Sequence, residues 1–73
     1  MFTKEKFARR LREVRKLRNK TQEDVAKALG ATVQWVSDLE RERRTTTPEK
    51  LAAICEFYDI SSDYLLGLKD EMK

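Results

Sequence analysis

Four residues at helical spacing offer the most specific chemistry in this sequence. Val33, Gln34, Ser37 and Asp38 stand at i, i+1, i+4 and i+5, which on a helix forms one solvent-facing strip. Three of these side chains carry hydrogen-bonding groups, and Val33 adds methyl groups. Base edges in the DNA major groove present matching donors, acceptors and a methyl group. The strip is therefore suited to contact with DNA bases.

The strip lies in the second half of a pattern that predicts two short helices joined by a tight turn. Across residues 21–40, TQEDVAKALGATVQWVSDLE, the spacing of apolar residues changes phase at Gly30. Thr21 and Thr32 are suitable N-caps, and the segment between Gly30 and Thr32 is a short turn that contains glycine. We therefore expect a helix-turn-helix unit over residues 21–41.

A longer helix is predicted before this unit. Phe7, Leu11 and Val14 recur at i, i+4 and i+7, which indicates a helix from about Thr3 to Arg18. Residues 1–20 hold nine Lys or Arg against two acidic residues, a net charge of +7, whereas the rest of the chain carries −4. One basic end favours a polyanionic partner, although a basic helix can also be a plain solvated face.

Two more helices are predicted after the unit, and no strand. Thr47 is a suitable N-cap with Pro48 at the first helical position, and this helix should end near Tyr58. Ser61 can cap a final helix that Gly67 closes. The sequence thus predicts a single compact all-α domain of five helices over residues 1–73.

The composition argues against several classes of function. The chain has no histidine and a single cysteine, so neither a zinc site nor an intramolecular disulfide has its ligands. Cys55 continues an apolar helical face and is expected to be a core residue rather than a redox sensor. We expect no enzyme, cofactor, metal or small-molecule ligand. Without a membrane span or signal peptide, a cytoplasmic location is expected.

Three segments resemble the lambda-repressor-like (Cro and repressor, Xre-type) helix-turn-helix family. TQEDVAKALG is similar to the family's T-Q-E-x-L-A-x-x-x-G, VSDLERERR to its I-S-x-I-E-x-G-x-R, and TPEKL to its P-x-x-L. The resemblance covers nearly the whole chain. It implies a five-helix domain whose third helix enters the major groove of double-stranded DNA, usually as a homodimer on a palindromic operator.

The resemblance assigns base contacts to the strip. Gln34 would read adenine, because a carboxamide both accepts and donates, and Val33 would meet a thymine methyl. Asp38 would either accept from cytosine or sit idle beside Arg41. Ser37 would allow close approach of the helix to DNA.

The same resemblance assigns contacts with DNA phosphates to residues around the strip. Gln22 matches the family's glutamine at a helix start, where free N–H groups also favour anions. Trp35 either packs on the helix that begins at Pro48 or lies along the DNA backbone. The link over residues 42–46 suits phosphate binding or a plain loop. The expected backbone contacts are Thr21, Gln22, Trp35, Arg41, Arg43 and Arg44.

Other positions match or depart from the family. Arg15 and Glu40 match a pair of positions where the family keeps an ion pair, which would orient the third helix. Glu42 replaces the usual glycine, so the loop there either adopts another conformation or is strained in a left-handed one. Asn19 and Lys20 also depart from the family, and a charge lies close to the core unless Lys20 extends outward.

These patterns favour a sequence-specific DNA-binding transcriptional regulator, with repression as the expected activity. The alternative is a protein-interaction module or antitoxin-like regulator with the same fold. A weak homodimer is expected, because five small helices cannot bury every apolar residue of the C-terminal part. The expected dimer interface consists of Phe57, Tyr64, Leu66 and Leu68.

Overall fold

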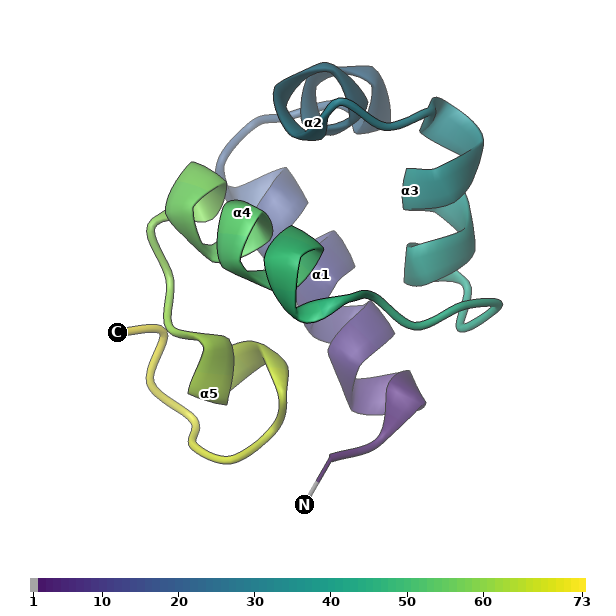
Figure 1. Ribbon diagram of the computed structural model, residues 1–73. Helices are drawn as coiled ribbons and strands as arrows, with labels where there is room; N and C mark the ends of the chain where they lie inside the picture. The colour runs from purple at the N-terminus through teal and green to yellow at the C-terminus, as the bar shows by residue number, and fades with distance from the viewer. Residues whose placement is uncertain (1) are drawn as a thin grey trace.

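The computed structural model describes residues 2–73 and shows five helices and no strand in that range. Figure 1 shows α1 at the back, α4 in front of it, α2 and α3 along the top and right, and α5 below α4. No helix within residues 2–73 is long and apolar enough to cross a membrane. The predicted all-α fold is confirmed. The helices are α1 (Lys4–Leu17), α2 (Gln22–Leu29), α3 (Val33–Glu40), α4 (Pro48–Tyr58) and α5 (Ser62–Leu65).

Each of these helices begins at a threonine or serine cap. The side-chain oxygen of the cap accepts a hydrogen bond from a backbone N–H two or three residues later, which satisfies a group that the helix leaves free. Four of the five caps were predicted at these positions; the exception is Thr3, which was predicted as the first residue of the helix and not as its cap. The caps are Thr3, Thr21, Thr32, Thr47 and Ser61.

Each helix is also followed by a residue in the left-handed conformation. After α1 the Lys20 N–H donates to the Arg15 carbonyl at 3.0 Å, and after α3 the Arg43 N–H donates to the Asp38 carbonyl at 2.8 Å. These bonds close the helix ends and need one left-handed residue in each turn. Only two of the five are glycines; asparagine and aspartate also tolerate this conformation, so Glu42 is the strained one. The left-handed residues are Asn19, Gly30, Glu42, Asp59 and Gly67.

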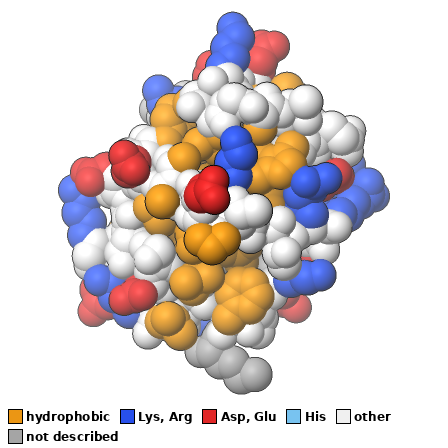
Figure 2. All heavy atoms as spheres, viewed as in Figure 1, with side chains coloured by type: hydrophobic (Ala, Val, Ile, Leu, Met, Phe, Trp, Pro, Cys, Tyr) orange, Lys and Arg blue, Asp and Glu red, His pale blue; other side chains and the backbone are white. Residues whose placement is uncertain are grey.

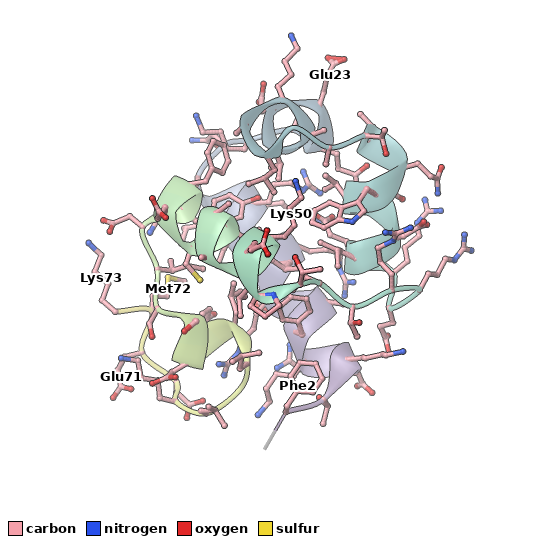
Figure 3. All side chains as sticks on the ribbon, in the orientation of Figure 1. Phe2, Glu23, Lys50, Glu71, Met72 and Lys73 are labelled. Carbon is pink, nitrogen blue, oxygen red and sulfur yellow. The ribbon has the colours of Figure 1, made fainter. Side chains whose placement is uncertain are left out.

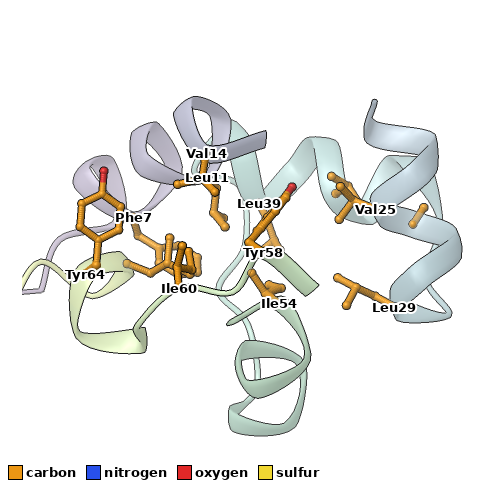
Figure 4. Packing of buried hydrophobic residues seen from close by; sticks show 13 residues of the cluster. Phe7, Leu11, Val14, Val25, Leu29, Leu39, Ile54, Tyr58, Ile60 and Tyr64 are labelled. Carbon is orange, nitrogen blue, oxygen red and sulfur yellow. The ribbon is translucent and has the colours of Figure 1, made fainter. Parts of the chain in front are cut away.

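The core lies between the helices and takes side chains from all five (Figure 4). α3 packs against α2 and α1, while α4 packs against α2 and α5. A small hollow of about 10 Å³ beside Tyr58 is no larger than one water requires. The buried apolar cluster is Phe7, Leu11, Val14, Val25, Ala26, Leu29, Val36, Leu39, Ile54, Tyr58, Ile60, Tyr64 and Leu65.

The segment after α5 folds back along the end of α4. The Met72 carbonyl accepts from the Ser61 N–H at 2.6 Å, and the Met72 side chain packs against the core (Figure 3). Lys73 Nζ lies 2.6 Å from the Asp59 carboxylate, which lowers the pKa of that exposed carboxyl. These contacts place the last residues against the domain.

Arg10 fixes this segment to α1, and the sequence analysis did not single it out. Its side chain is buried and donates to the carbonyls of Tyr64 and Lys69 and to the Asp70 carboxylate. The guanidinium also lies 4.2 Å from the centre of the Tyr64 ring. The sequence did hold one indication of this role: Arg10 is a charged residue three positions after Phe7, on the apolar face of the helix.

Candidate nucleic-acid interface

Fewer residues of α3 face solvent than the helical spacing of the four-residue strip predicted. Val33 is 44% exposed and Gln34 is exposed, but Ser37 retains only 8% exposure. Ser37 precedes the buried Glu40 by one turn, so its short side chain falls within the packed side of the helix. The placement of Ser37 in the exposed strip is therefore wrong. The exposed strip is reduced to Val33, Gln34 and the partly exposed Asp38.

The remaining polar residues of the strip contact one another. Gln34 Nε2 donates to Asp38 Oδ1 at 2.8 Å, one helical turn away. The other carboxylate oxygen of Asp38 lies 3.9 Å from Arg44 Nε. The cation beside Asp38 is therefore Arg44, from the link after α3, and not Arg41, which one of the two alternatives for Asp38 had named.

The inward end of α3 is held by the carboxylate of Glu40, whose side chain is 4% exposed. Glu40 Oε2 accepts from Arg15 Nε at 2.8 Å, and Oε1 accepts from Arg15 Nη2 and from Gln22 Nε2, both at 3.2 Å. Arg12 donates to the backbone carbonyl of Glu40. The hydrogen bond with Glu40 raises the pKa of Arg15, so the guanidinium keeps its charge. These bonds join α3 to both α1 and α2.

Two residues expected at the DNA backbone are hydrogen-bonded within the protein. The amide of Gln22 is directed at Glu40. The Thr21 hydroxyl accepts from the Asp24 N–H at 3.0 Å, and the Asp24 carboxylate accepts from the Thr21 N–H at 2.9 Å. The bond from the Thr21 backbone N–H, and after it the Thr21 side chain, lower the pKa of the Asp24 carboxyl. If Gln22 or Thr21 contacts a phosphate, it does so while its side chain keeps these hydrogen bonds within the protein.

Trp35 lies between α3 and α4. Its side chain is half-buried and packs against the core, which supports the packing alternative. Lys50 Nζ lies 5.9 Å from the Trp35 ring centre and donates to the Leu29 carbonyl at 2.7 Å (Figure 3). Because this carbonyl is at the C-terminal end of α2, the ammonium stabilises the partial negative charge there.

Much of the basic charge of α1 is used inside the protein. Arg10, Arg12 and Arg15 make the contacts described above, and Arg18 Nε donates to the Tyr58 carbonyl at 3.0 Å. These four arginines hold α1 against the rest of the domain. Four of the nine cations in residues 1–20 are thus engaged within the protein, while Lys4, Arg9, Lys16 and Lys20 remain exposed.

Exposed cations gather instead at the end of α3. Arg41, Arg43 and Arg44 are all exposed there. Figure 2 shows Lys and Arg side chains on the right-hand edge, where Figure 1 places the link between α3 and α4. Lys20, whose charge would lie close to the core if its side chain turned inward, is exposed and extends outward, with its Nζ 5.8 Å from the Phe57 ring centre. The cations of the link flank the exposed strip and suit contact with phosphates.

The residues expected at a dimer interface differ in exposure. Tyr64 is 7% exposed and is covered by Arg10, so its placement at an interface is wrong. Phe57 and Leu66 are half-buried, and Leu68 is 59% exposed. Beside Leu66 is a surface hollow of about 190 Å³, and Figure 2 shows apolar side chains over the lower half of this face. The apolar lining of the hollow is Phe2, Phe7, Pro48, Leu51 and Leu66.

The reactive groups of the core are held in their protonated forms. Burial raises the pKa of the Cys55 thiol, which is half-buried in α4. Burial, and then the nearby Glu40 carboxylate, raise the pKa of the Tyr58 hydroxyl. Within residues 2–73 no group of three His, Cys, Asp or Glu side chains is placed to hold a metal ion.

Comparison with known proteins shows one family. The model of the helix-turn-helix family matches residues 11–65, which include the whole helix-turn-helix unit. The chain therefore belongs to the helix-turn-helix family, whose relatives described below are transcriptional regulators rather than enzymes. The resemblance inferred from the sequence is confirmed.

Three relatives come from Bacillus subtilis (strain 168). The chain is 34% identical over 65 residues to the uncharacterized HTH-type transcriptional regulator YobD, covering 89% of this chain and 58% of that protein. It is 36% identical over 66 residues to the regulator ImmR, covering 90% and 51%. It is 38% identical over 59 residues to the uncharacterized regulator YazB, covering 81% and 86%. The chain thus spans little more than half of YobD and ImmR.

Solved structures show the same fold. The clp gene regulator ClgR from Corynebacterium glutamicum superposes with a TM-score of 0.80 at 28% identity, covering 86% of this chain and 67% of ClgR. The restriction-modification controller protein C.AhdI from Aeromonas hydrophila gives 0.79 at 29% identity, covering 85% and 94%. Both proteins are regulators, and both match most of this chain.

Proposed function

We propose that the chain binds double-stranded DNA sequence-specifically, with α3 in the major groove, and acts as a transcriptional repressor. The observation that carries this proposal is the division of α3 into two faces. One face is fixed by Val36, Leu39 and the bonds of Glu40, while the other presents Val33 and Gln34 to solvent. A helix held in this way keeps its exposed side chains in a constant register against base edges.

Separate residues supply specificity and affinity. Gln34 reads adenine and Val33 contacts a thymine methyl. Arg41, Arg43 and Arg44 bind phosphates on either side of the groove. Repression would follow where the bound site overlaps one that the transcription machinery needs, because a protein in the groove excludes others from the same DNA. A role in transcription is supported by the relatives YobD and ImmR, which are HTH-type transcriptional regulators, and by the clp gene regulator ClgR.

A homodimer on a palindromic operator fits the apolar residues of the C-terminal part. Leu68 is exposed, whereas Leu66, at the end of α5, and Phe57, in α4, are half-buried. Leu66 also lines the hollow with Leu51 and Pro48, and this hollow is apolar surface that a second copy could cover. A two-fold dimer would place its two α3 helices in half-sites about 34 Å apart.

Selection from a pool of duplex DNA with a randomised segment tests this function. We expect enrichment of a palindrome, with two protomers per duplex by sedimentation at saturation. Enrichment of a single half-site bound by one protomer would contradict the dimer but leave base reading in place. Enrichment of no sequence would contradict DNA reading itself. That result would favour the second candidate, a protein-interaction module or antitoxin-like regulator that uses the apolar hollow as its contact surface.

A further inference from the structure

The hydrogen bond between Gln34 and Asp38 determines which way the Gln34 amide faces. An ionised carboxylate has only acceptor oxygens, so the group of Gln34 that lies 2.8 Å from Asp38 Oδ1 must be the NH₂ group. One N–H is used in this bond. The amide therefore presents its carbonyl oxygen and its second N–H outward, as one acceptor and one donor.

We propose that Asp38 is a positioning residue that holds the Gln34 amide in this orientation and thereby sets a preference for adenine over guanine. The inference rests on the proposed function, because it concerns DNA read by α3. Adenine offers an N6 donor and an N7 acceptor, which match the oxygen and the free N–H of Gln34. Guanine offers two acceptors, O6 and N7, so one of them faces the outward oxygen of Gln34 without a donor.

The burial of Asp38 supports a positioning role over a direct base contact. Its side chain is 19% exposed, whereas Gln34 is an exposed residue. Both carboxylate oxygens already have partners, Gln34 on one and Arg44 on the other. Asp38 therefore acts on the DNA through Gln34.

Arg44 explains how an acidic residue can lie in a surface that faces phosphates. Its Nε lies 3.9 Å from Asp38 Oδ2, so the guanidinium places a positive charge beside the carboxylate. The left-handed Glu42 turns the chain back after α3, which brings the Arg43 N–H onto the Asp38 carbonyl and Arg44 beside the carboxylate. Gln34, Asp38 and Arg44 thus form one connected unit.

The test compares base preferences in the randomised duplex pool for the parent and for Asp38→Asn. Asparagine has nearly the same shape but can face Gln34 with either its oxygen or its NH₂ group, so it no longer fixes the Gln34 amide. Glu71→Gln is the matched control, because it removes the same charge from the C-terminal segment, away from α3 (Figure 3). A thermal melt of each variant checks that it is folded.

We expect the parent to prefer adenine over guanine at one position of the half-site by roughly 5- to 150-fold. Asp38→Asn should reduce that ratio several-fold and leave the other positions unchanged, while Glu71→Gln changes none. In the parent complex, 7-deazaadenine, which lacks N7, and purine, which lacks the N6 amino group, should each weaken binding at that position. This second measurement needs no variant of Asp38.

Three results would overturn the inference, and they are distinguishable from one another. If the parent enriches no sequence, the proposed function fails and the inference fails with it. If the parent is selective but Asp38→Asn keeps the same preferences, DNA reading stands and the positioning role alone fails. If Asp38→Asn loses a preference for cytosine instead, Asp38 contacts a base directly.

Discussion

At the scale of single residues, the carboxylate of Glu40 joins three helices. Arg15 reaches it from α1 and Gln22 from α2, while Glu40 itself ends α3. A buried charge is tolerated only while its partners are present, because a carboxylate or guanidinium left alone in the interior loses its hydration without compensation. Glu40 depends on Arg15 and Gln22, whereas Arg15 also donates to the Lys20 carbonyl at 3.1 Å, and the orientation of α3 depends on the bonds at Glu40.

Glu40→Ala should lower the free energy of unfolding by about 3–5 kcal/mol, because it leaves the partly buried Arg15 without its partner. Urea denaturation measures the change. Replacing both residues, as Arg15→Met with Glu40→Leu, should cost less than either single change, since no charge remains unpaired. Glu23→Ala, on the exposed side of α2 in Figure 3, is the control. An unfolding curve for Glu40→Ala that matches the parent would show that the pair contributes nothing.

Glu42→Gly should raise the free energy of unfolding by up to about 1 kcal/mol. Glu42 has a φ of 64°, a left-handed conformation that is strained for a residue with a Cβ atom and open to glycine. Glu42→Ala keeps the Cβ atom and removes only the carboxylate, so it should give no such gain. Equal stabilisation by both substitutions, in the same denaturation measurement, would assign the effect to charge instead of backbone strain.

At the scale of helices, the bounds depend on local chemistry. A threonine or serine oxygen starts each helix, and such residues can be recognised in the sequence ahead of an apolar pattern. The ends are harder to predict, because the left-handed residue after a helix can be any residue whose strain the fold compensates. Gly30 was evident from its type, whereas Asn19 and Glu42 adopt the same conformation without a glycine's freedom.

The cap of α2 should make stability depend on pH. Hydrogen bonds from Thr21 lower the pKa of Asp24 below its value of about 3.9 in the unfolded chain. A lowered pKa contributes stability above the unfolded value, and this contribution is lost as the pH falls through the folded value. Asp24→Asn should therefore lower the Tm at pH 7, with a difference from the parent that shrinks below about pH 4. A difference that is constant with pH would exclude this linkage; Glu23→Gln is the control.

At the scale of the whole molecule, α1 acts as the support for the other elements. Arg10 holds the C-terminal segment, Arg12 and Arg15 hold the end of α3, and Arg18 holds the end of α4. The segment charge of residues 1–20 could not show this, because a sum of charges does not say which cations meet carbonyls across the fold. The exposed charge that remains near α3 comes from the link over residues 41–44.

The fold could be predicted from the periodicity of apolar residues and from the helix caps. Parts of the candidate site could not, because they depend on how the helices pack. Gln34 and Val33 were predicted on the outward face of α3, and both are exposed there. Ser37 was expected in the exposed strip and Tyr64 at a dimer interface, and both are buried, because burial of a residue at the edge of a helical face depends on which neighbour covers it. For Tyr64 that neighbour is Arg10, which is 54 residues away in the sequence.

The proposed reading of bases by α3 is tested most directly by the salt dependence of two variants. The dissociation constants of Gln34→Ala and Arg43→Ala are measured on the selected duplex and on random duplex over a range of salt concentrations. Arg43→Ala should weaken binding to both duplexes about equally and reduce the salt slope by about one unit, because it loses one phosphate contact. Gln34→Ala should keep the parent slope and lose about 1–3 kcal/mol on the selected duplex alone. Equal weakening of selected and random DNA by Gln34→Ala would contradict base reading through α3.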